Sequence, residues 1–235
     1  AMDPDVLVFY EPTSCLDPSC SEDLKELLEE LNHDGKTIVI STHDVELAYP
    51  WADRAILLAE GQIIREDVPD VAFGNTKFVR MAHLSVPTLL ELSAELAKRG
   101  FPIPERKPRS VLDMVHIIES RHHNPCCHPA PGTITVCNVD TVAPGSVPAW
   151  VQARPGIAVG AMGTRAKQFA EKEKIALEFT YGIIDKCILR ALRGKDSLIL
   201  TTSAMADRVT ARVGAYCRES GNTIVVNPLD AGRST

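Results

Sequence analysis

Two clusters of polar side chains follow apolar runs near the start of the sequence, and their residue types are those of a ligand site. Glu11 and Pro12 follow the apolar run at residues 6–10, and a Ser-Thr-His-Asp tetrad containing His43 follows the run at residues 37–40. Carboxylate and imidazole are among the side chains that enzymes use most often as general bases. These clusters are therefore the first candidates for a binding or catalytic site.

The two apolar runs are expected to be buried strands that bring both clusters to one edge of a sheet. Each run is short and continuous, as buried strands are. Pro12 ends the first strand because proline has no N–H group to donate to a central ladder. Open α/β sheets bind their ligands at the carboxyl ends of the strands, so we expect Glu11 and His43 at the ligand-binding edge.

The residues between and after these strands predict a β-α-β unit followed by a hairpin. A helix is expected over residues 19–34, because its leucines recur every three or four positions. Ser19 or Ser21 is the expected cap, and Gly35 ends the helix. The next expected elements are a short helix and two hairpin strands, at residues 45–49, 55–58 and 62–65.

Three motifs stand in a fixed order: Glu-Pro-Thr-Ser from Glu11, Leu-Asp-Pro around Asp17, and Ser-Thr-His-Asp around His43. Over roughly residues 1–80, and more weakly to about 120, the chain resembles the second half of an ABC-transporter ATPase domain. The resemblance implies that Glu11 is the general base of ATP hydrolysis and that His43 contacts the γ-phosphate. Asp17 would face a partner subunit. The plain alternatives are a strand-end carboxylate at Glu11 and a capping or core histidine at His43.

The chain departs from this family at two positions and in two missing motifs. Tyr10 stands where the family has an aspartate that holds Mg²⁺, and a neutral phenol is a poor substitute for a hard anionic oxygen. Cys15 stands where the family has glycine. The sequence contains no G-x-x-x-x-G-K-[ST] phosphate loop and no Leu-Ser-Gly-Gly signature. We therefore expect a truncated subunit that does not hydrolyse ATP alone, with sequence damage or gene decay as the alternative origin of Tyr10 and Cys15.

Residues 76–120 resemble one particular group within the ABC-transporter ATPases. They predict amphipathic helices interrupted by the proline-rich residues 102–108, and they resemble cobalt/nickel-type, energy-coupling-factor importers. The resemblance implies ATP and Mg²⁺ as cofactors, and metal-ion uptake through a transmembrane transporter subunit. It also implies a second ATPase subunit, identical or different, and a place in the cytoplasm at the inner face of the cell membrane. An apolar helical stripe that is simply part of the core is the alternative.

Composition excludes several other classes of function. The chain has 235 residues, of which 45% are hydrophobic and 24% charged, as in ordinary globular proteins. A formal charge of −6 without a basic stripe argues against nucleic-acid binding. No apolar run approaches the roughly 20 residues of a membrane span, and no signal peptide is recognisable. Seven scattered cysteines, an odd number, suggest reduced thiols in a cytosolic protein.

The second half of the sequence predicts a separate small Rossmann-like α/β domain. Short apolar strands alternate with helices, a pattern typical of a parallel sheet covered by helices. We therefore expect a partial ABC ATPase domain at residues 1–80, a helical linker at 81–125 and the α/β domain at 130–235. The expected strands lie at residues 133–139, 157–160, 177–181, 197–202 and 223–226, and the helices at 164–174, 183–193 and 204–219.

Gly160, Gly163 and Thr164 are candidate ligand-binding residues in this domain. They follow a strand and open a helix, so their N–H groups could hold an anion, although a tight turn that needs glycine is the favoured alternative. Residues 201–203 end another strand and would line the same crevice. Asp185, Lys186 and Cys187 are further candidates.

Residues 122–128, His-His-Asn-Pro-Cys-Cys-His, carry side chains that suit Zn²⁺, Co²⁺ or Ni²⁺. Adjacent cysteines rarely share one tetrahedral ion, so an exposed linker is favoured and no metal site is assigned. Two readings of the whole chain compete with the importer subunit. One is a regulatory module that senses a small ligand or metal beside a vestigial ATPase half, and the other is an enzyme in the second domain, for which no nucleophile–base pair is recognisable.

Overall fold

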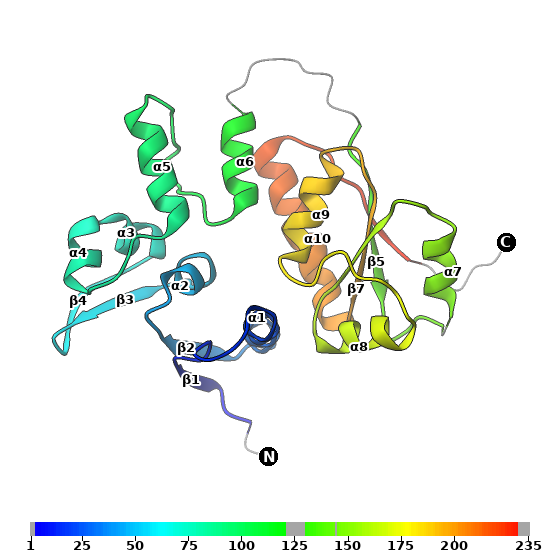
Figure 1. The fold of residues 1–235 in the computed structure, drawn as a ribbon, viewed down its shortest axis with the longest axis horizontal. Coiled ribbons are helices and arrows are strands. Elements are labelled where there is room, and N and C mark those ends of the chain that lie inside the picture. Colours follow the sequence, from blue (N-terminus) through cyan, green and yellow to red (C-terminus); the bar gives the residue numbers. More distant parts are fainter. Residues whose placement is uncertain (1–2, 121–129, 144, 230–235) are drawn as a thin grey trace. The chain divides into compact units, whose positions relative to one another are not determined.

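The structure is a computed structural model that describes residues 3–120, 130–143 and 145–229 (Figure 1). By its internal contacts the chain divides into two units. One unit comprises Ala1–Leu7, Thr13–Val39 and Asn124–Thr235. The other comprises Val8–Pro12 and Ile40–His123. The candidate residues Glu11 and His43 therefore belong to one unit, and Asp17 belongs to the other.

The chain opens with the expected β-α-β unit, formed by β1 (Val6–Tyr10), α1 (Pro18–His33) and β2 (Thr37–Ser41). The Thr37 N–H donates to the Asp5 carbonyl and the Glu11 N–H to the Ser41 carbonyl, so the strands run parallel. The cap of α1 is Asp17, and the prediction of Ser19 or Ser21 was wrong. The Asp17 carboxylate accepts the Cys20 N–H at 2.9 Å. Pro18 follows as the first helical residue, a position that suits the fixed φ of proline.

Strands β1 and β2 are not buried, contrary to the prediction from their apolar sequences, and Val39 of β2 is 47% exposed. Val8 is 73% and Tyr10 82% exposed, while the alternate residues of the strand are half-buried. Among the described residues these two strands form a sheet of their own. Side chains alternate between the two faces of a strand, and among the described residues the Val8 face of this two-stranded sheet is left uncovered.

The unit that contains Glu11 and His43 continues with a helix, a hairpin and four further helices. Strands β3 and β4 pair antiparallel through a turn at Glu60 and Gly61, both at positive φ, which confirms the predicted hairpin. Tyr49 and Phe73 meet edge to face in the core of this unit. Helix α3 was not predicted, since its six residues are too few for a periodic pattern. The elements are α2 (Val45–Trp51), β3 (Ala55–Ala59), β4 (Gln62–Asp67), α3 (Pro69–Gly74), α4 (Thr76–Met81), α5 (Thr88–Lys98) and α6 (Val111–Glu119).

The second half of the chain forms a four-stranded parallel sheet in the order β6-β7-β5-β8, as the alternation of strands and helices predicted. The expected strand at residues 177–181 is reduced to one bridge between Gly160 and Phe179. It stops there because Gly182, at positive φ, already begins the next helix. The elements are β5 (Ile134–Asn138), α7 (Ser146–Gln152), β6 (Ala158–Ala161), α8 (Thr164–Lys172), α9 (Ile183–Ala191), β7 (Ser197–Thr201), α10 (Ser203–Ser220) and β8 (Val226–Pro228).

Helices cover both faces of this sheet. Leu198 and Leu200 of β7 pack in one cluster with Val147 of α7 and Ala166 of α8, which places these helices on one face. Helices α9 and α10 contact each other and pack on β7 and β5, on the opposite face (Figure 1). All five residues of β7 are buried, as expected for a central parallel strand. No helix within the described ranges is long and apolar enough to cross a membrane.

Candidate functional site

Glu11 and His43 meet at the carboxyl edge of the β1–β2 pair. Glu11 is the first residue after β1, and its Oε1 atom lies 2.8 Å from His43 Nδ1. The same carboxylate accepts the His43 backbone N–H at 3.0 Å and the Thr42 hydroxyl at 3.0 Å. Three hydrogen bonds thus orient the carboxylate. The Glu11 side chain is 20% exposed and the imidazole 78%, so the carboxylate is sheltered and the imidazole faces solvent.

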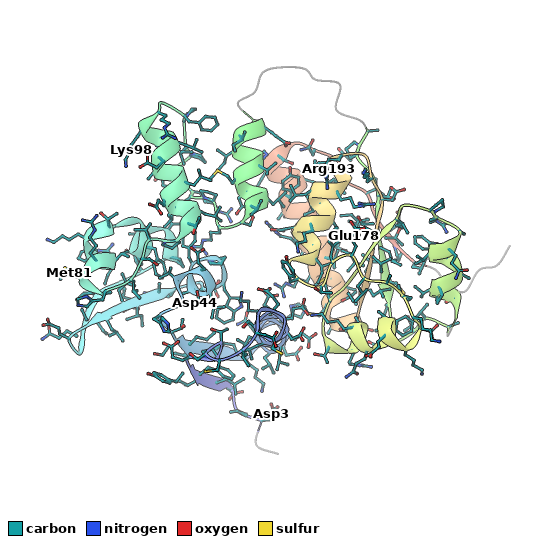
Figure 2. The ribbon with its side chains drawn as sticks, viewed as in Figure 1. Asp3, Asp44, Met81, Lys98, Glu178 and Arg193 are labelled. Atoms are coloured by element: carbon teal, nitrogen blue, oxygen red, sulfur yellow. The ribbon has the colours of Figure 1, made fainter. Side chains whose placement is uncertain are left out.

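The tetrad after β2 is held at both ends, which fixes the position of His43 between them. Ser41 ends β2 and accepts the Glu11 N–H at 2.8 Å. Asp44, labelled in Figure 2, caps α2 by accepting the N–H groups of Glu46 and Leu47, each at 3.0 Å. The Asp44 N–H in turn donates to the Thr42 hydroxyl. Sequence reasoning did not single out Thr42, and its signal was only its place in the Ser-Thr-His-Asp motif.

The contact between Glu11 and His43 shifts the pKa of both side chains. The hydrogen bond to His43 is the largest cause that lowers the pKa of Glu11 below its ordinary 4.5, and burial opposes it. The hydrogen bond to Glu11, followed by the attraction of its charge, raises the pKa of His43 above its ordinary 6.5. Both side chains are therefore charged between pH 4.5 and pH 6.5, the carboxylate negatively and the imidazole positively. Glu11 also has φ 45, a conformation that costs a non-glycine residue of order 1–3 kcal/mol and that clusters at functional sites.

The other candidates near the amino terminus do not join this pair. Tyr10 is the last residue of β1, and its phenol is largely exposed. Asp17 is the cap of α1 in the other unit. Cys15 has φ 65, the left-handed conformation in which glycine carries no penalty.

The residues at this edge do not by themselves fit Mg²⁺ and ATP. Mg²⁺ needs hard oxygen ligands in near-octahedral geometry, but the Glu11 carboxylate is engaged by Thr42 and His43. Tyr10 offers a phenol in place of the carboxylate oxygen that suits Mg²⁺. Within the described ranges, no group of three or more His, Cys, Asp or Glu side chains is arranged to hold a metal ion. The metal-like motif at residues 122–128 lies outside those ranges.

In the second half of the chain, the predicted glycine positions differ in role. A Cβ on Gly160 would lie 2.6 Å from the Ile183 side chain, so close packing against α9 requires glycine there. Gly163 has φ 83 and precedes α8, and its N–H donates to the Glu26 carboxylate at 3.1 Å. Thr164 is the first residue of α8.

The remaining candidates in this half are engaged or buried. The Asp185 carboxylate pairs with Arg212 at 2.9 Å, and Lys186 lies over the Tyr181 ring. Burial raises the pKa of the Cys187 thiol to about 12, so this cysteine is not a nucleophile. Sequence reasoning missed Asn138, the last residue of β5, and Asp140, two residues after it, at the carboxyl edge of the same sheet.

The relatives of the chain are, by their names, ABC-transporter and energy-coupling-factor ATP-binding proteins. The chain is 48% identical to the energy-coupling factor transporter ATP-binding protein EcfA2 of Methanospirillum hungatei, over 97% of this chain and 58% of that protein. It is 31% identical to a putative ABC transporter ATP-binding protein of Methanosarcina mazei, over 98% of this chain and 62% of that protein. It is 44% identical to the energy-coupling factor transporter ATP-binding protein EcfA of Methanococcus maripaludis, over 42% of this chain and 35% of that protein. The chain thus spans about three fifths of the first two relatives, and no family model matches it.

Proposed function

We propose that this chain is an ATP-binding subunit of an energy-coupling-factor ABC importer. The observation that carries the proposal is the contact of 2.8 Å between the Glu11 carboxylate and the His43 imidazole, at the carboxyl edge of paired parallel strands. In an open α/β sheet this edge is where ligands bind. The 48% identity with a protein named as such a subunit supports the assignment.

In this function Glu11 is the general base and His43 the contact for the terminal phosphate. A carboxyl with an ordinary pKa of 4.5 is already ionised at neutral pH, and the bond to His43 lowers that pKa further, so the proposed role of Glu11 rests on its position as an oriented carboxylate. The exposed imidazole is held within 2.8 Å of that carboxylate, on the side open to solvent. Asp17 is proposed to face a second ATPase subunit.

This chain alone is proposed not to hydrolyse ATP. Its sequence has no phosphate-loop motif, and Tyr10 replaces the anionic oxygen that holds Mg²⁺ in the family. The proposed working assembly adds a second ATPase subunit, identical or different, and a transmembrane subunit. Its proposed cargo is cobalt or nickel, and its place is the cytoplasmic side of the membrane.

The test is a chimera that joins this chain to the portion of the Methanospirillum hungatei protein that it does not cover. Glu11→Gln in the chimera should lower the rate of ATP hydrolysis by about 10²–10⁴, the usual contribution of a general base. Glu46→Gln is the matched control, since the Glu46 carboxylate binds Thr88 and makes no contact with His43. Equal loss of activity in both variants, or none in Glu11→Gln, would refute the role of Glu11.

A second candidate function is a regulatory α/β module in the second half of the chain that senses a small ligand or metal. Several relatives align with only 42–50% of this chain, whereas two align with nearly all of it. The larger alignments necessarily include the four-stranded sheet, so the module accompanies some of these subunits. An accessory domain of this kind suits regulation better than catalysis, because the buried Cys187 thiol supplies no nucleophile.

A further inference from the structure

Helix α1 and the four-stranded sheet belong to the same structural unit, although they come from opposite halves of the chain. The helix has two different faces. Its leucines form an apolar face, on which Leu28 is only 1% exposed. Asp23, Glu26 and Glu30 recur three and four positions apart and form an acidic face. The acidic face is separate from the face that α1 buries.

Basic side chains of α8 and α10 meet this acidic face. The Lys167 ammonium group of α8 lies 2.5 Å from the Asp23 carboxylate and 2.8 Å from that of Glu26. The Arg208 guanidinium of α10 lies 2.6 Å from the Glu29 carboxylate. Helices α8 and α10 follow the strands β6 and β7, so α1 lies against the edge where these two strands end.

The turn before α8 takes part in the contact through its backbone. The Gly163 N–H donates to the Glu26 carboxylate at 3.1 Å. Gly163 has φ 83, and a Cβ at this position would collide with the Glu30 carboxylate. Glycine therefore allows both the backbone conformation of the turn and the close approach of α1.

The ion pairs make this contact specific without making it strong. The Lys167 side chain is 19% exposed and that of Glu26 14%, so both charges have lost much of their water. Burial raises the pKa of Glu26 above its ordinary 4.5, even though Lys167 and the Gly163 N–H favour the charged form. The loss of hydration in such pairs largely offsets the attraction of the charges. The contact can therefore open at little cost, because its charges regain water when they separate.

Helix α1 leads directly back to Asp17. The Asp17 carboxylate caps the helix by accepting the Cys20 N–H at 2.9 Å. The Leu16 N–H donates to the Thr13 carbonyl at 3.2 Å, and Cys15 has φ 65, so a tight turn precedes the cap. A displacement of α1 is thus transmitted to Asp17 through the cap.

We propose that the contact between the acidic face of α1 and the basic side chains of α8 and α10 is a releasable latch. Through this latch the second half of the chain controls the position of Asp17. The closed latch holds α1 against the sheet edge, and the open latch lets α1 and its cap move. The consequence for transport rests on the proposed function, in which Asp17 faces a second ATPase subunit. The latch would then make the pairing of the two ATPase subunits depend on the state of the α/β module.

The test is amide hydrogen exchange of the whole chain, followed by NMR at the Gly163 N–H. Arg208→Glu should raise the exchange rate of this group about tenfold, because repulsion from Glu29 opens the latch. Adding Glu29→Arg should restore the wild-type rate, because the pair forms again with its charges exchanged. Glu22→Gln is the matched control, since Glu22 pairs with Lys25 on α1 itself, and it should leave the rate unchanged.

The Cys20 N–H provides a second signal, which reports on the cap at Asp17. Its exchange rate should rise in Arg208→Glu and return in the double variant, together with that of Gly163. Lys167→Met is a second opening variant and should raise both rates as well. Raising the salt concentration from about 0.1 M to about 1 M should do the same in the wild-type chain, because it shortens the range of charge attraction from about 10 Å to about 3 Å.

Each part of the proposal can fail separately. An unchanged Gly163 rate in Arg208→Glu and Lys167→Met, or no rescue by Glu29→Arg, would overturn the latch. A change at Gly163 without one at Cys20 would overturn the control of Asp17. None of these measurements uses ATP, so their failure is distinguishable from a failure of the proposed function, which the chimera tests. A preserved spectrum elsewhere establishes that each variant is folded.

Discussion

The two parallel sheets of this chain place polar residues at the same kind of edge but leave them in opposite states. At the β1–β2 edge the strands are partly exposed, and the polar side chains satisfy one another, since the Glu11 carboxylate accepts three hydrogen bonds. At the edge of β7 the strand is fully buried, and the Thr201 hydroxyl has no partner among the described residues. The polar side chains of the first edge are thus paired with one another, whereas the second edge leaves a buried hydroxyl without a partner.

The largest expected difference between the two sheets is in stability. Leu198→Ala in β7 should lower the free energy of unfolding by about 2–5 kcal/mol, because a fully buried leucine leaves a cavity. Val8→Ala in β1 should change it by less than about 0.5 kcal/mol, because that side chain is 73% exposed. Urea unfolding followed by circular dichroism measures both. A loss at Val8 as large as that at Leu198 would show that β1 is covered in solution.

A smaller effect on the free energy of unfolding is expected from substitutions of Cys15 and Cys20. The effect has opposite signs at these two positions. Cys15→Gly should stabilise the chain by about 1 kcal/mol, because φ 65 is strained for cysteine and free for glycine. Cys20→Gly should destabilise it by up to about 1 kcal/mol, because Cys20 lies within α1, where glycine is a poor helix former. The same unfolding experiment checks the pair, and equal signs would contradict the assigned backbone conformations.

The smallest effect is the shift in the titration of His43. Its raised pKa means that the pair stabilises the fold fully below 6.5 on the imidazole side, and this contribution is lost as the pH rises through the folded value. The lowered pKa of Glu11 gives a contribution that is present above 4.5 and lost as the pH falls through the folded value. Between 4.5 and 6.5 both contributions are present.

Glu11→Gln should therefore bring the pKa of His43 back toward 6.5, as measured by NMR of the imidazole protons. Glu46→Gln serves again as the control and should leave that titration in place. A His43 titration that is the same in the wild-type chain and in Glu11→Gln would mean that the two side chains do not meet in solution.

The sequence was sufficient for most of the elements, with α3, α7 and the strand at 177–181 as exceptions, and for the approach of Glu11 to His43, because local patterns and motif order determine both. It was insufficient wherever the result depends on what packs against an element. The apolar sequence of β1 suggested burial, but periodicity cannot tell whether a strand face has a covering layer. Asn138 and Asp140 belong to no motif, and only the strand order brings them to Ser203.

The cap of α1 was missed for a different reason, because a signal in the sequence was overlooked. Asp17, Ser19 and Ser21 are all good capping residues, and the choice among them depends on where the chain turns into the helix. Pro18 decides it, since proline is favoured at the first helical position and so makes Asp17 the residue before it.

The proposed place of this chain in an ATP-driven importer depends most directly on Tyr10. In the chimera with the portion of the Methanospirillum hungatei protein that this chain does not cover, Tyr10→Asp should raise the rate of ATP hydrolysis about a hundredfold, because it supplies one anionic oxygen for Mg²⁺. Adding Glu11→Gln to that variant should abolish the gain. Equal rates in the unmodified chimera and in the Tyr10→Asp variant would contradict the account.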